Sequence, residues 1–235
     1  MIMLERPSRS WSSNERGSRS VPALRRGIIV GADDFIRDDD MDEWVRRALA
    51  KWPDVPALFG WLGLSRRGHW LIQGERITHP RIVETISRNY AVDAHGRWFF
   101  QNGPQRGYVA LDYAPRVARV QADDGLVDHT GTPVTDARAL YLDEDSAAVL
   151  DSPDGAALID SADLAWVLER LRHRGEAVDD AALEAALEAP GGTATDLTLD
   201  AFGRALAVHR CDRDALPAAL GFVRDPQPRD DDPGA

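Results

Sequence analysis

The sequence predicts an α+β fold made of two related motifs, each a helix followed by antiparallel strands, with a small helical and extended region at the C-terminal end. Three observations lead to this fold class. Apolar residues recur at helical spacing in short segments that open on a proline or an aspartate, and runs of aromatic and β-branched residues flank turn dipeptides such as Asn-Gly. The same short motifs also occur twice along the chain in the same order, which indicates two duplicated units.

Five regions are expected along the 235 residues. The first region lacks periodicity and is rich in Ser, Arg and Asp, and the last is a polar stretch with several prolines, so both are expected to be disordered. Met41 directly precedes the first helical stripe, which makes it a candidate for the true start of the protein. The disordered extension, the first motif, the second motif, the C-terminal helical or hairpin region and the disordered tail are expected at residues 1–40, 41–120, 121–172, 173–223 and 224–235.

In the first motif, a strand at 70–75 enters a turn and Pro80 opens a helix. Proline is favoured at the first helical position, where its missing N–H would have no partner in any case. Ile82, Val83 and Ile86 then share one helical face.

A hairpin completes the first motif. Its strands are expected at 97–100 and 107–111, with the reversal at Asn102-Gly103. Both turn residues tolerate a positive φ, which is what a tight hairpin turn requires.

The second motif repeats this plan in a shorter form. The pattern G-x-x-[IV]-T-x-x-R spans residues 74–81 and occurs again at 131–138. Val92-Asp93 corresponds to Leu142-Asp143, and two strand-like runs follow each pair. Between the arginine and this pair the second copy is shorter by seven residues, mostly at the expense of the helix.

Aspartates open two more helices in the C-terminal part. Asp163 precedes apolar residues at helical spacing, and Asp179 begins a helix that ends before Pro190. Residues 197–209 fit two structures. We prefer a hairpin around Phe202-Gly203, but the apolar positions also fit one helix, so both alternatives stay open.

An uncharacterised proteobacterial family, domain of unknown function 1285 (DUF1285), or a close sibling of it, resembles this chain over about residues 60–172. The motifs that carry the resemblance are G-E-R-I at 74–77, D-A-H-G-R-W at 93–98, and the hairpin that ends in Asp112 and Pro115. The resemblance implies an α+β protein of two related helix-plus-strand motifs, with no established activity and a signalling role only proposed. Residues 176–223 depart from the pattern, and no catalytic residue carries over because that family has none assigned.

The hairpin turn of the first motif is the most distinctive polar segment. Its donors and acceptors could bind the edge of a small polar ligand or an anion, because loops on a rigid hairpin often carry such sites. The alternative is a turn whose side chains only face water. The candidate ligand-binding residues of this turn are Gln101, Asn102, Gln105 and Arg106.

The helix that begins at Pro80 offers a second candidate. Arg81 and Arg88 are seven residues apart, so they share a helical face and could grip a phosphate, with His79 beside them. The alternative is a solvated helix face. If the protein is an enzyme acting on an anionic small molecule, we expect Arg81, His79 and Arg106 near its site.

No motif in the sequence assigns a catalytic residue, a metal site or a cofactor. The six histidines lack metal-ligand spacing, and Cys211 is the one cysteine, so no disulfide forms within the chain. Nucleotide-binding glycine motifs and activated-nucleophile motifs are absent as well. We therefore expect no catalytic residue, no metal and no cofactor.

Charge divides the two motifs. The net charge is −11 overall, but it is +5 over residues 41–120 and −15 over residues 121–200. We expect the basic first motif to bind a small anionic ligand or an acidic protein surface, and the acidic second motif to repel phosphate. The acidic total argues against binding of nucleic acid.

Localisation follows from apolar length and cysteine usage. The apolar runs are far shorter than the roughly 20 residues that span a bilayer, and residues 25–34 are too short in apolar length for a signal peptide. We expect a cytoplasmic ligand- or protein-binding regulatory module without catalysis, with a role in signalling. The alternative function is an enzyme that acts on an anionic small molecule through the first motif.

Overall fold

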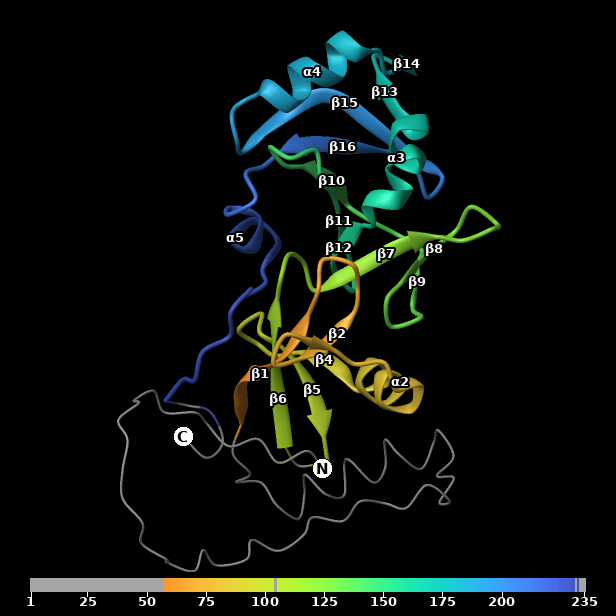
Figure 1. Ribbon diagram of the computed structural model, residues 1–235. Coiled ribbons are helices and arrows are strands. Elements are labelled where there is room, and N and C mark those ends of the chain that lie inside the picture. The colour runs from red at the N-terminus through yellow and green to blue at the C-terminus, as the bar shows by residue number, and fades with distance from the viewer. Residues whose placement is uncertain (1–56, 104, 231, 233–235) are drawn as a thin grey trace, which may run out of the picture. The chain divides into compact units, whose positions relative to one another are not determined.

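The computed structural model describes residues 57–103, 105–230 and 232, all of which belong to one compact unit, residues 45–235. These residues form two mixed β-sheets with short helices attached to them (Figure 1). The described chain is therefore mostly β, and the prediction of an α+β fold is wrong. The helix expected after Met41 lies outside the described residues.

The first sheet has six strands, and its order is β3-β2-β1-β6-β5-β4. β1 and β6 pair in parallel, whereas the other neighbours are antiparallel. Helix α2 (Pro80–Arg88) connects β3 to β4, as the proline and the apolar spacing predict. The strands are β1 (Leu58–Leu64), β2 (Trp70–Ile72), β3 (Glu75–Arg76), β4 (Tyr90–Val92), β5 (Trp98–Asn102) and β6 (Gln105–Leu111).

The second sheet has ten strands in the order β14-β13-β15-β16-β10-β11-β12-β7-β8-β9. Two of its pairs are parallel, β10 with β16 and β12 with β7. The strands are β7 (Arg116–Val120), β8 (Leu126–Asp128), β9 (Pro133–Val134), β10 (Ala139–Leu142), β11 (Ala148–Ser152), β12 (Gly155–Ile159), β13 (Leu171–His173), β14 (Glu176–Ala177), β15 (Thr193–Ala201) and β16 (Arg204–Arg210).

The expected helices exist but are short. A 3-10 turn, η1 (Ser161–Asp163), leads into α3 (Leu164–Arg170), and α4 (Asp180–Glu188) lies along β15 (Figure 1). Asp179 caps α4 by accepting a hydrogen bond from the Ala182 N–H at 2.8 Å. Helix α5 (Leu216–Leu220) follows the second sheet.

Residues 197–209 lie in a hairpin, which confirms the preferred alternative. β15 and β16 pair antiparallel, and the turn residues Phe202 and Gly203 have φ values of 54° and 74°. Two successive positive φ values are typical of the tight turn that matches strand twist.

The two sheets share one pairing order. β7 to β12 pair with one another in the same way as β1 to β6, including the central parallel pair. Gly74 and Gly131, the first residues of the repeated pattern, lie in the equivalent turns with φ of 83° and 89°. No helix stands between β9 and β10, so the shortened second copy has lost the counterpart of α2.

The α+β prediction fails because strands pair over long distances in sequence. The described helices are only about two turns long, so they can cover part of a sheet but cannot form a layer of comparable size. The predicted hairpins are joined by parallel pairs between segments that lie 30 to 70 residues apart, as between β7 and β12 or between β10 and β16. Local sequence patterns do not encode such pairs.

Strands β11 and β12 are buried on both faces. Ala148 and Leu150 belong to one apolar cluster, which also contains residues of α3 and α4, whereas Val149 belongs to another. That second cluster joins the middle of the ten-stranded sheet to the six-stranded sheet, where Trp70 and Trp98 are buried. The strands therefore read as continuous apolar runs, as strands covered on both sides do.

The C-terminal segment contacts the six-stranded sheet, although its composition predicts a disordered tail. The Val223 N–H donates to the Gly96 carbonyl at 2.9 Å. Arg97 donates from Nη1 and Nη2 to the two carboxylate oxygens of Asp232 at 2.9 and 2.5 Å, and from Nε to Asp93 at 2.8 Å. The Arg97 side chain is buried, so it needs these carboxylates, and they hold the segment in place.

No helix within the described residues has the length and apolar character needed to cross a membrane.

Candidate functional site

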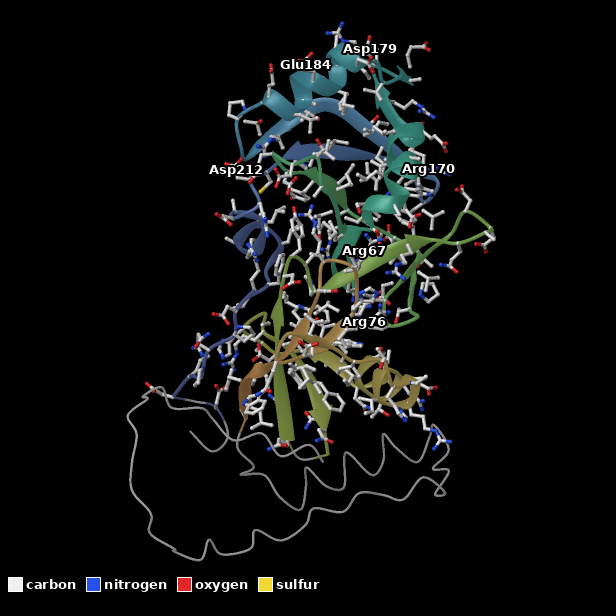
Figure 2. The ribbon with its side chains drawn as sticks, in the orientation of Figure 1. Arg67, Arg76, Arg170, Asp179, Glu184 and Asp212 are labelled. Carbon is white, nitrogen blue, oxygen red and sulfur yellow. The ribbon has the colours of Figure 1, made fainter. Side chains whose placement is uncertain are left out.

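A small cavity of about 270 Å³ brings basic side chains of the first motif against turns of the second. Two arginines come from the turn between β1 and β2, where Figure 2 labels Arg67. Two serines come from the turn between β10 and β11 and from the start of η1. The lining residues are Arg66, Arg67, Asp145, Ser146, Ala147, Leu158, Ile159, Ser161 and Leu164.

The turn that carries both arginines is held by its own hydrogen bonds. The Ser65 N–H donates to the His69 carbonyl at 2.9 Å, and the Ser65 hydroxyl accepts from the His69 N–H at 2.9 Å. Gly68 has φ of 72° and lies so close to His129 that an added Cβ would stand 2.8 Å from the His129 Cβ. The turn therefore packs closely against the segment that contains His129, and its hydrogen bonds fix the backbone of Arg66 and Arg67.

Arg66 stacks on a buried tyrosine. Its Cζ lies 4.5 Å from the centre of the Tyr113 ring, and the Tyr113 hydroxyl donates to Asp143 Oδ2. The Arg213 guanidinium lies 5.4 Å from the same ring. Burial, and then the hydrogen bond to Asp143, raise the pKa of Tyr113, so its hydroxyl stays a donor. Arg66 forms no salt bridge with any carboxylate in the described part of the chain.

Arg67 is positioned by a second buried aspartate. Asp160 accepts a hydrogen bond from Arg119 Nε at 3.2 Å and forms a 3.7 Å ion pair with Arg67 Nη2. Arg119 Nη2 also donates to the Arg67 carbonyl at 2.7 Å. The Asp160 side chain is only 4% exposed, whereas that of Arg67 is 62% exposed, so the carboxylate anchors a guanidinium that still reaches solvent.

Several arginine charges lie near the turn that carries Arg66 and Arg67. Burial lowers the pKa of His69, and the nearby charges of Arg76, Arg119 and Arg67 lower it further. Asp160 opposes this effect but does not outweigh it. Positive charge at a surface of this kind attracts anions.

Two aspartates of the acidic second motif help to position basic side chains of the first motif at this cavity. Asp143 and Asp160 belong to the segment of charge −15, yet both side chains are buried and directed at side chains of the cavity wall or its support. Asp143 holds Tyr113, on which Arg66 stacks, and Asp160 pairs with Arg67. Neither of these two carboxylates is exposed to solvent.

The predicted hairpin residues lie in the paired ends of β5 and β6, next to the turn, and interact with one another. Gln101 Nε2 donates to the Gly103 carbonyl at 2.7 Å, and its Oε1 accepts from Arg106 Nε at 3.4 Å. Arg106 also stacks on the Phe99 ring at 4.5 Å. Asn102 and Gln105 form the last backbone pair before the turn. Within the described residues these contacts serve the hairpin, and the cavity described above does not include them.

The predicted helix residues are spread over the length of α2. His79 is the residue before the helix, Arg81 is in its first turn, and Arg88 is at its end, where it pairs with Glu84 at 2.9 Å. The ends of α2 are about 12 Å apart, given the rise of 1.5 Å per residue. Arg88 precedes Asn89, whose carbonyl accepts from the Gln101 N–H at 2.9 Å, so this end of α2 and the hairpin are neighbours. His79 and Arg81 lie at the other end of α2, away from the hairpin.

Sequence reasoning did not select Arg66 and Arg67. Their signal was an Arg-Arg pair between Ser65 and Gly68, inside the basic first motif. This pair does not indicate a site by itself, because the other half of the cavity, with Ser146 and Ser161, lies about 80 to 95 residues further along the chain.

A larger groove, of about 1130 Å³, lies between the β7–β8 turn, α3 and the β15–β16 turn. Its arginines already have carboxylate partners: Arg170 pairs with Asp124, and Arg204 pairs with Asp136 at 2.6 Å. In the described ranges, no group of three or more His, Cys, Asp or Glu side chains could hold a metal ion. The arginine-lined cavity is therefore the better candidate for a ligand.

Comparison with known proteins returns families without an assigned activity. The model of a family described as "Protein of unknown function (DUF2946)" matches residues 41–227. A search of curated proteins found no match.

Two similar solved structures are DUF1285 family proteins. One, from Silicibacter pomeroyi DSS-3, has 16% identity and a TM-score of 0.45, and the match covers 65% of this chain and 81% of that one. The other, from Shewanella baltica OS155, has 14% identity and a TM-score of 0.35, with 43% and 85% covered. Both belong to the family that the motifs of this sequence resemble.

Proposed function

We propose that this chain, which belongs to the family described as protein of unknown function (DUF2946), is a regulatory module that binds a small anionic ligand. The ligand site is the cavity lined by Arg66 and Arg67, called here the Arg66–Arg67 cavity. The module acts in the cytoplasm, in keeping with its single cysteine, and responds to the ligand without transforming it.

The observation that best supports this proposal is the Arg66 guanidinium, which lines the cavity and has no carboxylate partner among the described residues. Other arginines of the described chain, such as Arg116, Arg170 and Arg204, are each paired with an aspartate. A guanidinium that is pre-oriented by an aromatic ring and lacks a counter-ion favours an external anion.

Binding without catalysis is preferred because, in the described chain, no serine hydroxyl of the cavity is hydrogen-bonded to a base that could activate it. Asp145 lines the cavity but bonds neither Ser146 nor Ser161, and the Tyr113 hydroxyl is already used as a hydrogen-bond donor to Asp143. The alternative enzyme would use His79, Arg81 and Arg106. His79 and Arg81 lie at the N-terminal end of α2 and Arg106 lies in the β5–β6 hairpin, and none of the three lines the cavity.

A thermal-shift and calorimetry experiment tests the proposal. Purified full-length protein is titrated with a panel of small organic phosphates, sulfates and carboxylates. We expect at least one anion to raise the melting temperature, and Arg66→Ala with Arg67→Ala to weaken its binding by about a hundredfold or more, since charge-assisted hydrogen bonds contribute about 1.5–3 kcal/mol each.

The matched control is Arg138→Ala. Arg138 is exposed, pairs with Asp151 at 2.8 Å and lies outside the cavity, so its removal changes the net charge by as much as Arg66→Ala or Arg67→Ala alone. The proposal fails if no anion binds, or if Arg138→Ala weakens binding as much as a cavity variant does.

A further inference from the structure

We propose that the ligand of the Arg66–Arg67 cavity is the phosphate monoester of a small hydroxylated molecule. This inference rests on the proposed function and names the class of its ligand. It follows from the chemistry of the cavity wall, which has three parts. One part carries arginines and serine hydroxyls, the second is apolar, and the third is an aspartate.

The basic part of the wall suits a tetrahedral anion. Arg66 and Arg67 supply guanidinium donors, and the hydroxyls of Ser146 and Ser161 have no hydrogen-bond partner in the described chain. A carboxylate is planar and can be satisfied by one guanidinium fork, whereas a phosphate monoester has three terminal oxygens and close to two negative charges. Two guanidinium groups and two hydroxyls supply enough donors for all three terminal oxygens of the phosphate.

The remaining wall limits the rest of the ligand. Leu158, Ile159 and Leu164 offer contacts for a few carbon atoms. Asp145 is the acidic lining residue, forms no ion pair with another described residue, and would repel a second anionic group. Its carboxylate can accept a hydrogen bond from a ligand hydroxyl. A cavity of about 270 Å³ is also below the size of sites for drug-sized molecules, so a nucleoside polyphosphate does not fit.

Charge outside the cavity favours the same ligand. Arg119 and Arg76 both act on His69, beside the turn that bears Arg66 and Arg67. A dianion is drawn to such a surface more strongly than a monoanion, because the electrostatic energy scales with its charge.

Calorimetric titration of the full-length protein with four probes tests this ligand class. The probes are glycerol 3-phosphate, inorganic phosphate, glycerate and glycerol. We expect glycerol 3-phosphate to bind most tightly, inorganic phosphate and glycerate at least about tenfold more weakly, and glycerol not at all. The double variant Ser146→Ala with Ser161→Ala should weaken glycerol 3-phosphate about tenfold and glycerate by much less, because only the phosphate uses both hydroxyls.

The acidic wall is tested separately with Asp145→Ala. This variant should bind inorganic phosphate at least as well as the native protein but lose most of its preference for glycerol 3-phosphate, since the acceptor for the ligand hydroxyl is gone. Asp230→Ala, at an exposed position outside the cavity, is the charge-matched control.

The outcomes separate this inference from the proposed function. Glycerate binding as tightly as glycerol 3-phosphate, with both lost in Arg66→Ala, would overturn the phosphate class but keep the anion-binding module. Phosphate binding that Ser146→Ala with Ser161→Ala leaves unchanged also contradicts the inference. If no probe binds, both proposals lose their support.

Discussion

At the scale of the residue, buried aspartates do the positioning in this protein. Asp93 and Asp143 occupy equivalent places in the two motifs, and each accepts hydrogen bonds from two backbone N–H groups of the turn that follows it. Each carboxylate then has one oxygen left for a side chain: Arg97 for Asp93, and Tyr113 for Asp143. An aspartate that the sequence indicates only as a turn residue thus also positions a side chain, which is four residues away for Asp93 and thirty residues away for Asp143.

Tyr113→Phe tests this positioning. The substitution leaves the ring under Arg66 but removes the hydroxyl that donates to the buried Asp143, so we expect the free energy of unfolding to fall by about 1–3 kcal/mol. Anion binding should change little, because the stacked ring remains. Urea denaturation measures the first effect and calorimetry the second.

Tyr141→Phe is the matched control for that substitution. Tyr141 stacks on His209 with ring centres 5.1 Å apart, and no hydrogen bond is made by its hydroxyl within the described chain. We expect this change to stay within about 0.5 kcal/mol. Equal urea midpoints for the native protein and Tyr113→Phe would contradict the role assigned to the tyrosine hydroxyl.

At the scale of the element, short turns decide how the sheets meet. The β11–β12 turn ends at Gly155, which has φ of 117° and lies against the ring of Trp98 in β5. The β1–β2 turn meets the second sheet in the same manner through Gly68 and His129. Both contacts join segments that are far apart in sequence, and both use a glycine because a side chain has no room.

Gly155→Ala should be strongly destabilising. An added Cβ would stand 2.6 Å from Trp98 Cζ2, and Trp98 is only 4% exposed, so the ring has little room to move. Together with the positive φ, we expect a loss of about 2–4 kcal/mol in the free energy of unfolding, measured by urea denaturation.

Gly131→Ala separates the two causes. Gly131 has a positive φ of 89° but no atom within 4 Å of an added Cβ. This control should lose only the backbone strain of about 1–2 kcal/mol. A loss as large as that of Gly155→Ala would show that contact with Trp98 is not what makes Gly155 necessary.

At the scale of the whole molecule, the two sheets meet through a junction of aromatic and charged groups. His129 lies 5.1 Å from Trp70 and 5.7 Å from Tyr90 between ring centres, and Arg116 pairs with the adjacent Asp128. Burial lowers the pKa of His129 from 6.5 to about 4. Asp128 opposes this shift, whereas the charges of Arg116 and Arg119 add to it. The junction therefore holds a neutral imidazole.

This lowered pKa predicts a loss of stability in mild acid. The unfolded chain takes up a proton at His129 near pH 6.5, whereas the folded protein does so only near pH 4. The contribution is thus complete above pH 6.5 and is lost as the pH falls from 6.5 to about 4, by an amount of about 3 kcal/mol. Urea denaturation at a series of pH values measures it.

His129→Gln gives the comparison, because glutamine does not titrate. The variant is expected to be less stable at pH 7 but to lose less stability between pH 6.5 and 4. Parallel stability curves for the native protein and His129→Gln would rule out this role of His129.

The sequence by itself determined the local structure and the charge of this protein. The proline that begins α2, the aspartate before α4 and the Asn-Gly and Phe-Gly turns are signals that act within a few residues, so these helices and hairpins could be predicted. The repeat and the basic first motif could be identified in the same way. Only the tertiary structure decided the parallel pairs that join the hairpins into two sheets, and the meeting of Arg66 and Arg67 with Ser146 and Ser161. The physical reason is that such contacts depend on packing between segments many residues apart, which no local preference of the backbone specifies.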